Sequence, residues 1–244
     1  MTKQKYKNPP IVEAVCEIRF PADNKWGMNS FIKFANSAEK AGFPNVVDAA
    51  EGFQINFQMG NESEPPSLKP VSRRIQTWNK GQTALWQASS ELFAANHKIP
   101  YLGWKKFRPH IQKGFDLYAH VAQPKKAERF SLHYINRIEF ASEESPARYV
   151  KFVPPDIRYA DSIETIFCHT QQVFINGDII QLTSARDPNF ESGLAVILNL
   201  IYTKVSPPLD KVGFKQALEL GHQRLIDAFE QTITDEQRLR MVEI

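Results

Sequence analysis

The first strongly patterned stretch of the chain, residues 11–20, alternates apolar and polar side chains. One face would carry Val12, Ala14, Cys16, Ile18 and Phe20, and the other is mostly charged. This period of two with one polar face is typical of a half-buried β-strand. We predict a strand there and then a helix over about 30–40, where apolar residues recur at helical spacing after an Asn29 or Ser30 cap and before Gly42.

Three strands and a long helix are predicted to follow. The strands cover 53–59, 73–79 and about 83–94, and the helix covers about 103–121. Lys80-Gly81 is a turn signal between the second and third strands, and so short a connection predicts an antiparallel hairpin. Pro109 falls inside the helical pattern, so we expect either that it lies in the first turn or that the helix begins nearer Arg108.

The second half of the chain repeats this order of elements. Strands are predicted at 131–140, 163–175, 178–184 and 194–205, and helices at 214–232 and 235–242. Asn176-Gly177 between two strand-like runs is a strong hairpin signal, and Thr234 with Gln237 resembles a capping box. Residues 143–160 are irregular, at the place where the first half has its helix over 30–40.

These elements predict an α+β protein made of two pseudo-repeats, residues 1–122 and 123–244, that form one continuous compact unit. Both repeats would contain a strand, three antiparallel strands and a long helix. Side by side, they would give a curved antiparallel sheet with both long helices on one face and the other face open to a partner. The alternative is chance similarity, because the halves share little residue identity and hairpin-plus-helix units are common.

Composition excludes several classes of protein. Of the 244 residues, 42% are hydrophobic and 23% are charged, which is ordinary for a globular protein and argues against disorder. Cys16 and Cys168 are far apart in the sequence, which suggests a reducing compartment. The chain starts without an apolar signal-peptide core, and its longest apolar run, 194–202, is too short to span a bilayer. We therefore expect a cytoplasmic protein without a membrane segment.

The polar faces of the predicted strands 11–20 and 131–140 carry the first set of candidate site residues. They are Glu13, Glu17, Arg19, His133, Arg137 and Glu139. If the two strands are neighbours, carboxylates beside His and Arg can transfer protons or bind a phosphate or carboxylate. The alternative, which we favour, is a solvated sheet face with weak ion pairs.

A basic tract over residues 105–129 carries the second set. Seven basic residues face only Asp116 and Glu128 within it, although the net charge of the whole chain is only +3. The basic residues are Lys105, Lys106, Arg108, Lys113, Lys125, Lys126 and Arg129, and Arg73 and Arg74 lie near Trp78. Basic side chains near Trp78, Trp86 and Trp104 can bind single-stranded nucleic acid by backbone contact and stacking. The alternative is a solvated helix and linker with the Trp residues in the core.

Signals for metals, cofactors and covalent catalysis are weak. None of the six histidines has a His, Cys or acidic neighbour at the spacing of a zinc site. The sequence has no G-x-S-x-G elbow and no Gly-rich phosphate loop, so we expect no metal and no cofactor. Asn136 falls on the apolar face of its predicted strand, and a buried Asn should be hydrogen-bonded.

Three segments resemble a sporadically distributed family of uncharacterised bacterial proteins. NPPIVEAVCEIRFP (8–21) is similar to the opening of that family, SLHYINRIEF (131–140) to its middle strand, and residues 220–241 to its closing helix pattern. The resemblance implies no established activity, and marks Glu13, Glu17, Asn136 and Arg137 as motif residues only. The scattered distribution of the family implies exchange between genomes, as for mobile defence or toxin–antitoxin loci.

The first hypothesis for function is a non-catalytic binding protein that holds a protein partner or a second copy on the open sheet face or in the groove between repeats. The second is nucleic-acid binding through the tract 105–129. The third is a hydrolase or nuclease that uses Glu13, Glu17, His133 and Arg137. Without a catalytic motif in the sequence, we expect that the protein is not an enzyme.

Overall fold

The computed structural model describes residues 6–21, 26–49, 53–56, 67–70, 74–154 and 165–242. In the first half of the chain the elements are β1 (Ile11–Arg19), α1 (Met28–Lys40), β2 (Asn45–Ala49), β3 (Phe53–Asn56), β4 (Ser67–Pro70), β5 (Arg74–Trp78), β6 (Ala84–Ala88), β7 (Leu92–Lys98) and α2 (Trp104–Ala122). In the second half they are β8 (Arg129–Phe140), the 3₁₀ turn η1 (Pro146–Arg148), β9 (Phe167–Val173), β10 (Ile179–Arg186), β11 (Leu194–Val205), α3 (Lys211–Thr232) and α4 (Asp235–Val242).

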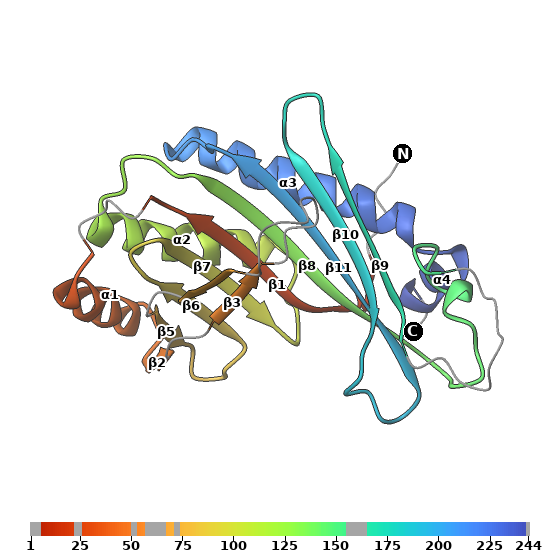
Figure 1. Cartoon of the computed structure of the whole chain (residues 1–244). Helices are drawn as coiled ribbons and strands as arrows, with labels where there is room; N and C mark the ends of the chain where they lie inside the picture. The colour runs from red at the N-terminus through yellow and green to blue at the C-terminus, as the bar shows by residue number, and fades with distance from the viewer. Residues whose placement is uncertain are drawn as a thin grey trace.

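Nine of the strands form one antiparallel sheet in the order β2-β5-β6-β7-β1-β8-β11-β10-β9 (Figure 1). The described helices pack on this sheet, so the predicted α+β class with an antiparallel sheet is confirmed. Outward from the central pair β1–β8, the order is β7, β6, β5, β2 on one side and β11, β10, β9 on the other. Strand order does not test common origin, so the duplication stays a prediction.

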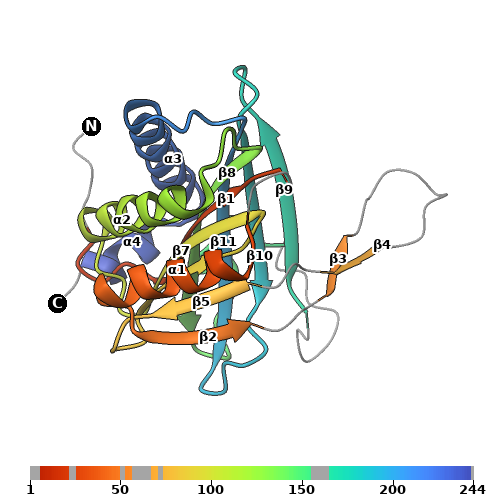
Figure 2. The ribbon, with the colours of Figure 1, turned by 90° about the vertical axis from the view of Figure 1, so that its left-hand side faces the viewer.

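All the described helices lie on one side of the sheet, and the side opposite them is called the open face below (Figure 2). The separate pair β3–β4 stands away from the sheet on the side of the open face. The helix-facing side chains of the central strands are fully buried, among them Cys16, Ile18, Leu132, Leu198 and Tyr202. The core therefore lies between the sheet and the helix layer.

Two helices approach the sheet at glycines. A Cβ atom at Gly114 of α2 would lie 2.3 Å from Nε1 of the buried Trp86, and one at Gly221 of α3 would lie 2.7 Å from Cδ1 of Tyr202. A side-chain carbon cannot come so close to another heavy atom. Any side chain at these positions would therefore force the helix or the aromatic ring to move. These glycines let each long helix pack directly on an aromatic ring of the sheet.

The predicted strand over 83–94 was wrong. The structure has two strands there, β6 and β7, joined by a turn in which Ser89 N–H donates to the Leu92 carbonyl at 2.8 Å. Leu85 and Ala94 are buried although they belong to the open face, so apolar residues on both faces concealed the turn. The short strands β2 and β4 were not predicted at all.

Other predictions need smaller corrections. Strand 53–59 is described only as far as Asn56, and β3 there pairs with β4 rather than with the main sheet. Pro109 is the sixth residue of α2 and does not lie in its first turn. Because proline has no N–H, the helical hydrogen bond to the Lys105 carbonyl is missing. The Asn176-Gly177 hairpin is confirmed, with Gly177 at φ +80°. Thr234 caps α4 by accepting from the Gln237 N–H at 3.2 Å, but Gln237 Oε1 has no partner among the described residues.

None of the described helices combines the length and the apolar character that a bilayer crossing requires. The finding concerns helices only.

Candidate functional site

The two charged strand faces predicted from the sequence lie side by side at the centre of the sheet. β1 pairs with β8 in antiparallel register, so that Val15 lies opposite His133 and Glu17 lies opposite Ser131. Residues at alternate positions share a face, and the buried alternates of both strands face the helices. The six candidate residues of β1 and β8 therefore all belong to the open face.

Glu17 is the centre of the first group. Its Oε1 accepts from Arg19 Nε at 2.7 Å and lies 3.5 Å from a terminal guanidinium nitrogen of Arg129. Only 19% of the Glu17 side chain is exposed. Two cations on one shielded carboxylate fix the position of all three side chains at one end of the β1–β8 pair.

His133 lies next to this group on the same face, two positions along the strands from Glu17. Burial lowers the pKa of His133; Glu17 acts in the opposite direction, while Arg129 and Arg19 lower it further. The ring is therefore neutral at pH 7, with one nitrogen able to donate and the other able to accept.

Two shielded polar atoms on the open face have no hydrogen-bond partner within the described part of the chain. They are Nε2 of His133 on β8 and Oδ1 of Asn199 on the neighbouring β11. Asn199 lies opposite Ile135 and His133 opposite Ile201, so the two polar residues are diagonal neighbours, two positions apart along the strands. Buried polar groups are nearly always hydrogen-bonded, so an unpartnered pair calls for an explanation.

Glu13 belongs to a different group, a ladder of side-chain hydrogen bonds that crosses four strands. Asn96 of β7 donates to Glu13 at 2.8 Å, Gln87 of β6 donates to Asn96 at 3.1 Å, and Gln76 of β5 donates to Gln87 at 3.2 Å. Trp78 Nε1 extends the ladder by donating to Gln76 at 3.3 Å. The first half of the open face is therefore held together by amide groups.

Arg137 and Glu139 form a third group. Arg137 Nε lies 2.8 Å from Glu139 Oε1, and the Arg137 guanidinium lies 5.7 Å from the ring centre of Phe190. Glu139 is eight residues along β8 from Ser131, which pairs with Glu17, so about 26 Å of strand separates the two ion-pair groups. Acid–base catalysis needs groups within hydrogen-bond reach, so the three groups do not make one catalytic site of the kind the third hypothesis requires.

The basic tract does not form a single surface in the described structure. Lys105, Lys106, Lys125 and Lys126 are exposed. Arg108 pairs with Glu219 of α3, Lys113 donates to the Ala41 carbonyl at 2.9 Å, and Arg129 reaches Glu17 on the open face. The tract is divided between the helix side and the open face because α2 and β8 lie on different layers.

The tryptophans and the neighbouring arginines are also separated. Trp86 is completely buried against α2, and Trp104 stacks on His222 with ring centres 4.2 Å apart. Trp78 and Arg74 lie on the open face, where Arg74 donates to Gln87 at 3.4 Å. Arg73 lies outside the described residues. Trp86 and Trp104 are thus not arranged as a stacking platform beside the tract.

The sequence did not reveal a polar cluster between α2, α3 and β8. Tyr134 Oη lies 2.6 Å from His222 Nδ1, and Trp104 Nε1 donates to Glu219 Oε2 at 3.0 Å. Burial raises the pKa of Tyr134 well above its usual value, so the phenol stays protonated. These contacts join α2 to α3 over the middle of the sheet. Tyr134 fits the apolar face of its strand. The only sign of the cluster in the sequence was that a Tyr hydroxyl on this face would need a hydrogen-bond partner.

Asn136 is buried on the helix-facing side of β8, as the sequence predicted. Its Nδ2 donates to the Tyr134 carbonyl at 3.2 Å and to the Leu198 carbonyl at 3.1 Å. Both acceptors are backbone atoms of β8 and β11. Asn136 therefore supports the pairing of these strands, which confirms the expectation that it is hydrogen-bonded.

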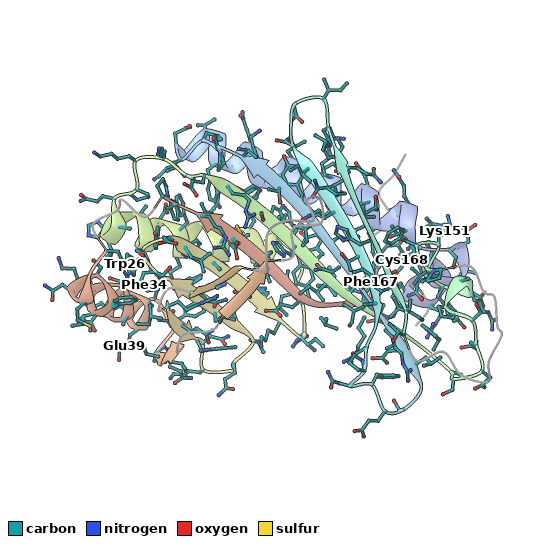
Figure 3. The ribbon with its side chains drawn as sticks, in the orientation of Figure 1. Trp26, Phe34, Glu39, Lys151, Phe167 and Cys168 are labelled. Atoms are coloured by element: carbon teal, nitrogen blue, oxygen red, sulfur yellow. The ribbon has the colours of Figure 1, made fainter. Side chains whose placement is uncertain are left out.

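A cleft of about 320 Å³ lies on the helix side, between α3 and the outer strands β9 and β10. Phe152, Phe174 and Leu182 line it together with Lys151 and Arg224. The Arg224 guanidinium lies 4.1 Å from the ring centre of Phe174. Figure 3 shows Lys151 and, on β9, Phe167 and Cys168 at this end of the molecule.

Among the described residues, no group of three or more His, Cys, Asp or Glu side chains is placed to hold a metal ion. No protein-family model matches the chain, and no curated protein matches it either. The resemblance carried by residues 8–21 and 131–140 therefore stays a prediction.

Proposed function

We propose that this protein is a non-catalytic binding protein that holds a protein partner on the open face of its sheet. The observation that carries the proposal is the pair His133 Nε2 and Asn199 Oδ1, two shielded polar atoms of adjacent strands without a partner among the described residues. A partner that reaches the centre of the open face can supply the missing hydrogen bonds.

The size and chemistry of the open face favour a protein as the partner. Nine strands at a spacing of about 4.8 Å make a face about 40 Å across, which matches a protein surface better than a small ligand. The face carries amides, hydroxyls and charges of both signs, and this mixture is typical of the rim of a protein interface. The strand pair β3–β4 stands away from the sheet on this side, so a partner bound to the open face can also contact it.

The charge pattern weakens the nucleic-acid alternative. Nucleic-acid surfaces concentrate one sign of charge, whereas Arg19 and Arg129 share Glu17, and Arg137 is paired with Glu139. Paired cations have less to gain from a phosphate, because binding would first break the ion pair. The open face therefore suits a partner with alternating charges.

A capture experiment with two matched variants tests the proposal. The open-face variant combines Glu17→Gln, Arg19→Gln and Arg129→Gln, which removes one negative and two positive charges without leaving an unpaired shielded charge. The control is Lys105→Gln on the exposed surface of α2, which changes the net charge by the same amount. The tagged proteins are incubated with lysate of the native host, and the captured protein is then purified and titrated calorimetrically against each variant.

We expect a stoichiometric partner for the wild type and for Lys105→Gln, and at least a tenfold weaker affinity for the open-face variant. Equal affinity of both variants would contradict the use of this face. Absence of any stoichiometric partner would contradict the proposal as a whole. A fall in affinity of both variants by the same factor would show that net charge, and not this site, controls binding.

A further inference from the structure

Among the described residues, no strand pairs with the outer edge of β9, and this edge lacks the usual protection against pairing. Its seven residues, FCHTQQV, contain no Lys, Arg, Asp, Glu or Pro. Phe167 is 64% exposed and Val173 is 65% exposed. Edge strands of monomeric proteins are normally short or carry charges or prolines that prevent association, so β9 is unusual.

The opposite edge of the same sheet gives an internal reference. β2 has five residues and begins directly after Pro44. Short length and an adjacent proline are protective features that β9 lacks. The contrast singles out one edge of the sheet for pairing.

The register between β9 and β10 shows which backbone groups point to the free edge. Phe174 N–H donates to the Asp178 carbonyl and Arg186 N–H donates to the Ile166 carbonyl, both within the β9–β10 register. In an antiparallel pair, the residues that exchange hydrogen bonds alternate with those that do not. The N–H and C=O groups of Phe167, His169, Gln171 and Val173 therefore point away from β10.

These four residues are self-complementary. An antiparallel pair of β9 strands centred on Thr170 sets Phe167 opposite Val173 of the other copy, and His169 opposite Gln171. Apolar side chains then meet apolar ones, amide meets imidazole, and about eight backbone hydrogen bonds form at the four outward-pointing positions of each strand. Thr170 meets its own copy at a position where strands approach closely without backbone hydrogen bonds.

We propose that β9 pairs with β9 of a second copy of this chain around a two-fold axis at Thr170. The partner is a second copy, because no like charges meet in this register and apolar side chains coincide at both ends. The axis is perpendicular to the sheet, so the helices of both copies stay on one side and the two helix-side clefts face each other. This inference does not depend on the open-face proposal.

The mass of the protein in solution tests the pairing. We expect sedimentation equilibrium to show a rise from 27.9 kDa towards twice that mass as concentration increases. Gln171→Pro removes one outward N–H and leaves the bonds to β10 intact, whereas Gln171→Ala keeps that N–H. Both variants lose the side-chain hydrogen bond from Gln181 to Gln171. The intended difference between them is the outward-pointing backbone N–H of residue 171, which only Gln171→Ala keeps.

We expect Gln171→Ala to dimerise like the wild type and Gln171→Pro to weaken dimerisation at least tenfold. His169→Lys with Gln171→Lys places lysines opposite each other across the pair at exposed positions, and it should give a monomer without changing the backbone. A monomeric wild type at every concentration would overturn the proposal. So would a dimer that persists both in Gln171→Pro and in the double lysine variant.

Cross-linking tests the register. In a Cys168→Ser background, Thr170→Cys places two thiols opposite each other at the two-fold axis, where strands are closest. Gln172→Cys in the same background is the control, because its copies would be four residues out of register. We expect an intermolecular disulfide in the first variant only. Equal cross-linking of both, or of the control alone, would exclude the register centred on Thr170.

Discussion

The sheet has two flanks, the first formed by β7, β6, β5 and β2 and the second by β11, β10 and β9. In both, three consecutive antiparallel strands run outward from the centre in reverse chain order, but the helix-side cover differs. On the first flank, α1 packs against β5 and α2, and Phe34 is completely buried beneath it, with Trp26 stacked on Tyr118 at 5.3 Å between ring centres. Figure 3 shows Trp26 and Phe34 at this end. On the second flank, the corresponding region beside α3 is a cleft of about 320 Å³.

The segment after each central strand accounts for the difference. After β1, the chain forms the 13-residue helix α1 with Phe34 and Ala38 on its buried side. After β8, the described part of the segment has only the three-residue turn η1 and residues up to Pro154. Pro146 lies in η1 and Pro154 follows it, and prolines are unfavourable inside helices. Strand order therefore does not decide how an outer strand is covered, and within the described part of the chain the outer edge of β9 is unpaired.

The largest expected effect comes from removing the apolar contact of α1. Phe34→Ala should lower the free energy of unfolding by about 3–5 kcal/mol, because it leaves a cavity under a fully buried ring. Phe174→Ala, in the cleft of the second flank, should cost only about 1 kcal/mol, because that ring is partly exposed. Urea denaturation measures both. Equal losses would show that the cleft is packed as tightly as the region under α1.

Next in size are the two helix glycines. Gly114→Ala should destabilise by about 2 kcal/mol and Gly221→Ala by about 1 kcal/mol, after the gain in helix propensity is included, because the Cβ clash is shorter at Gly114. Thermal unfolding of the single variants checks the order. Trp86→Phe should relieve part of the Gly114→Ala loss in the double variant. A stabilising Gly114→Ala would mean that α2 can shift away from the sheet.

The flanks should also differ in their response to acid. Burial lowers the pKa of His110 to about 3, with a further contribution from His97. Because the folded pKa lies below the unfolded value of about 6.5, the contribution of His110 to stability is complete above pH 6.5 and is lost as pH falls towards 3. Between pH 7 and 5.5 the loss is about 1 kcal/mol. His110→Gln should remove this part of the dependence of the free energy of unfolding on pH. Urea denaturation at several pH values measures it.

Asp178 of the second flank gives the control for this titration. Burial by itself would raise its pKa, but hydrogen bonds from Tyr202, Asn176 and Lys204 lower it overall. Its contribution to stability is therefore present above about pH 4 and is lost only below that value. Asp178→Asn should change the slope below pH 4 and leave the range from pH 7 to 5.5 unaffected. A changed slope in the upper range would contradict the assignment to His110.

The last comparison lies within the open face, where the smallest single effect is expected. Arg137→Ala with Glu139→Ala removes an exposed ion pair and should change the free energy of unfolding by less than about 1 kcal/mol. Asn96→Ala should cost about 1–2 kcal/mol, because Asn96 is only 6% exposed and its loss leaves Glu13 and Gln87 without these partners. Chemical denaturation in low and high salt separates the two, since only the ion pair should depend on salt.

Much of the fold could be predicted because long elements carry a clear period. The strands at 11–20 and 131–140, the final helices and the Asn176-Gly177 hairpin all correspond to observed elements. The prediction failed at β6 and β7, where the buried Leu85 and Ala94 interrupt the polar face, and at β2 and β4, which are too short to show a period. Of the candidate site, the alternation predicted that Glu17 and His133 lie on polar faces. It left open whether those faces meet.

The sequence by itself determined which side chains of β1 and β8 point to the helices and which to the open face, because alternation is a local property of each strand. Only the tertiary structure decided that these strands are neighbours, that Arg19 and Arg129 both contact Glu17, and that Glu139 is about 26 Å of strand away. Pairing and register depend on contacts between residues more than a hundred positions apart. For the same reason, the cleft beside α3 and the free edge of β9 became visible only when the two flanks of the sheet could be compared.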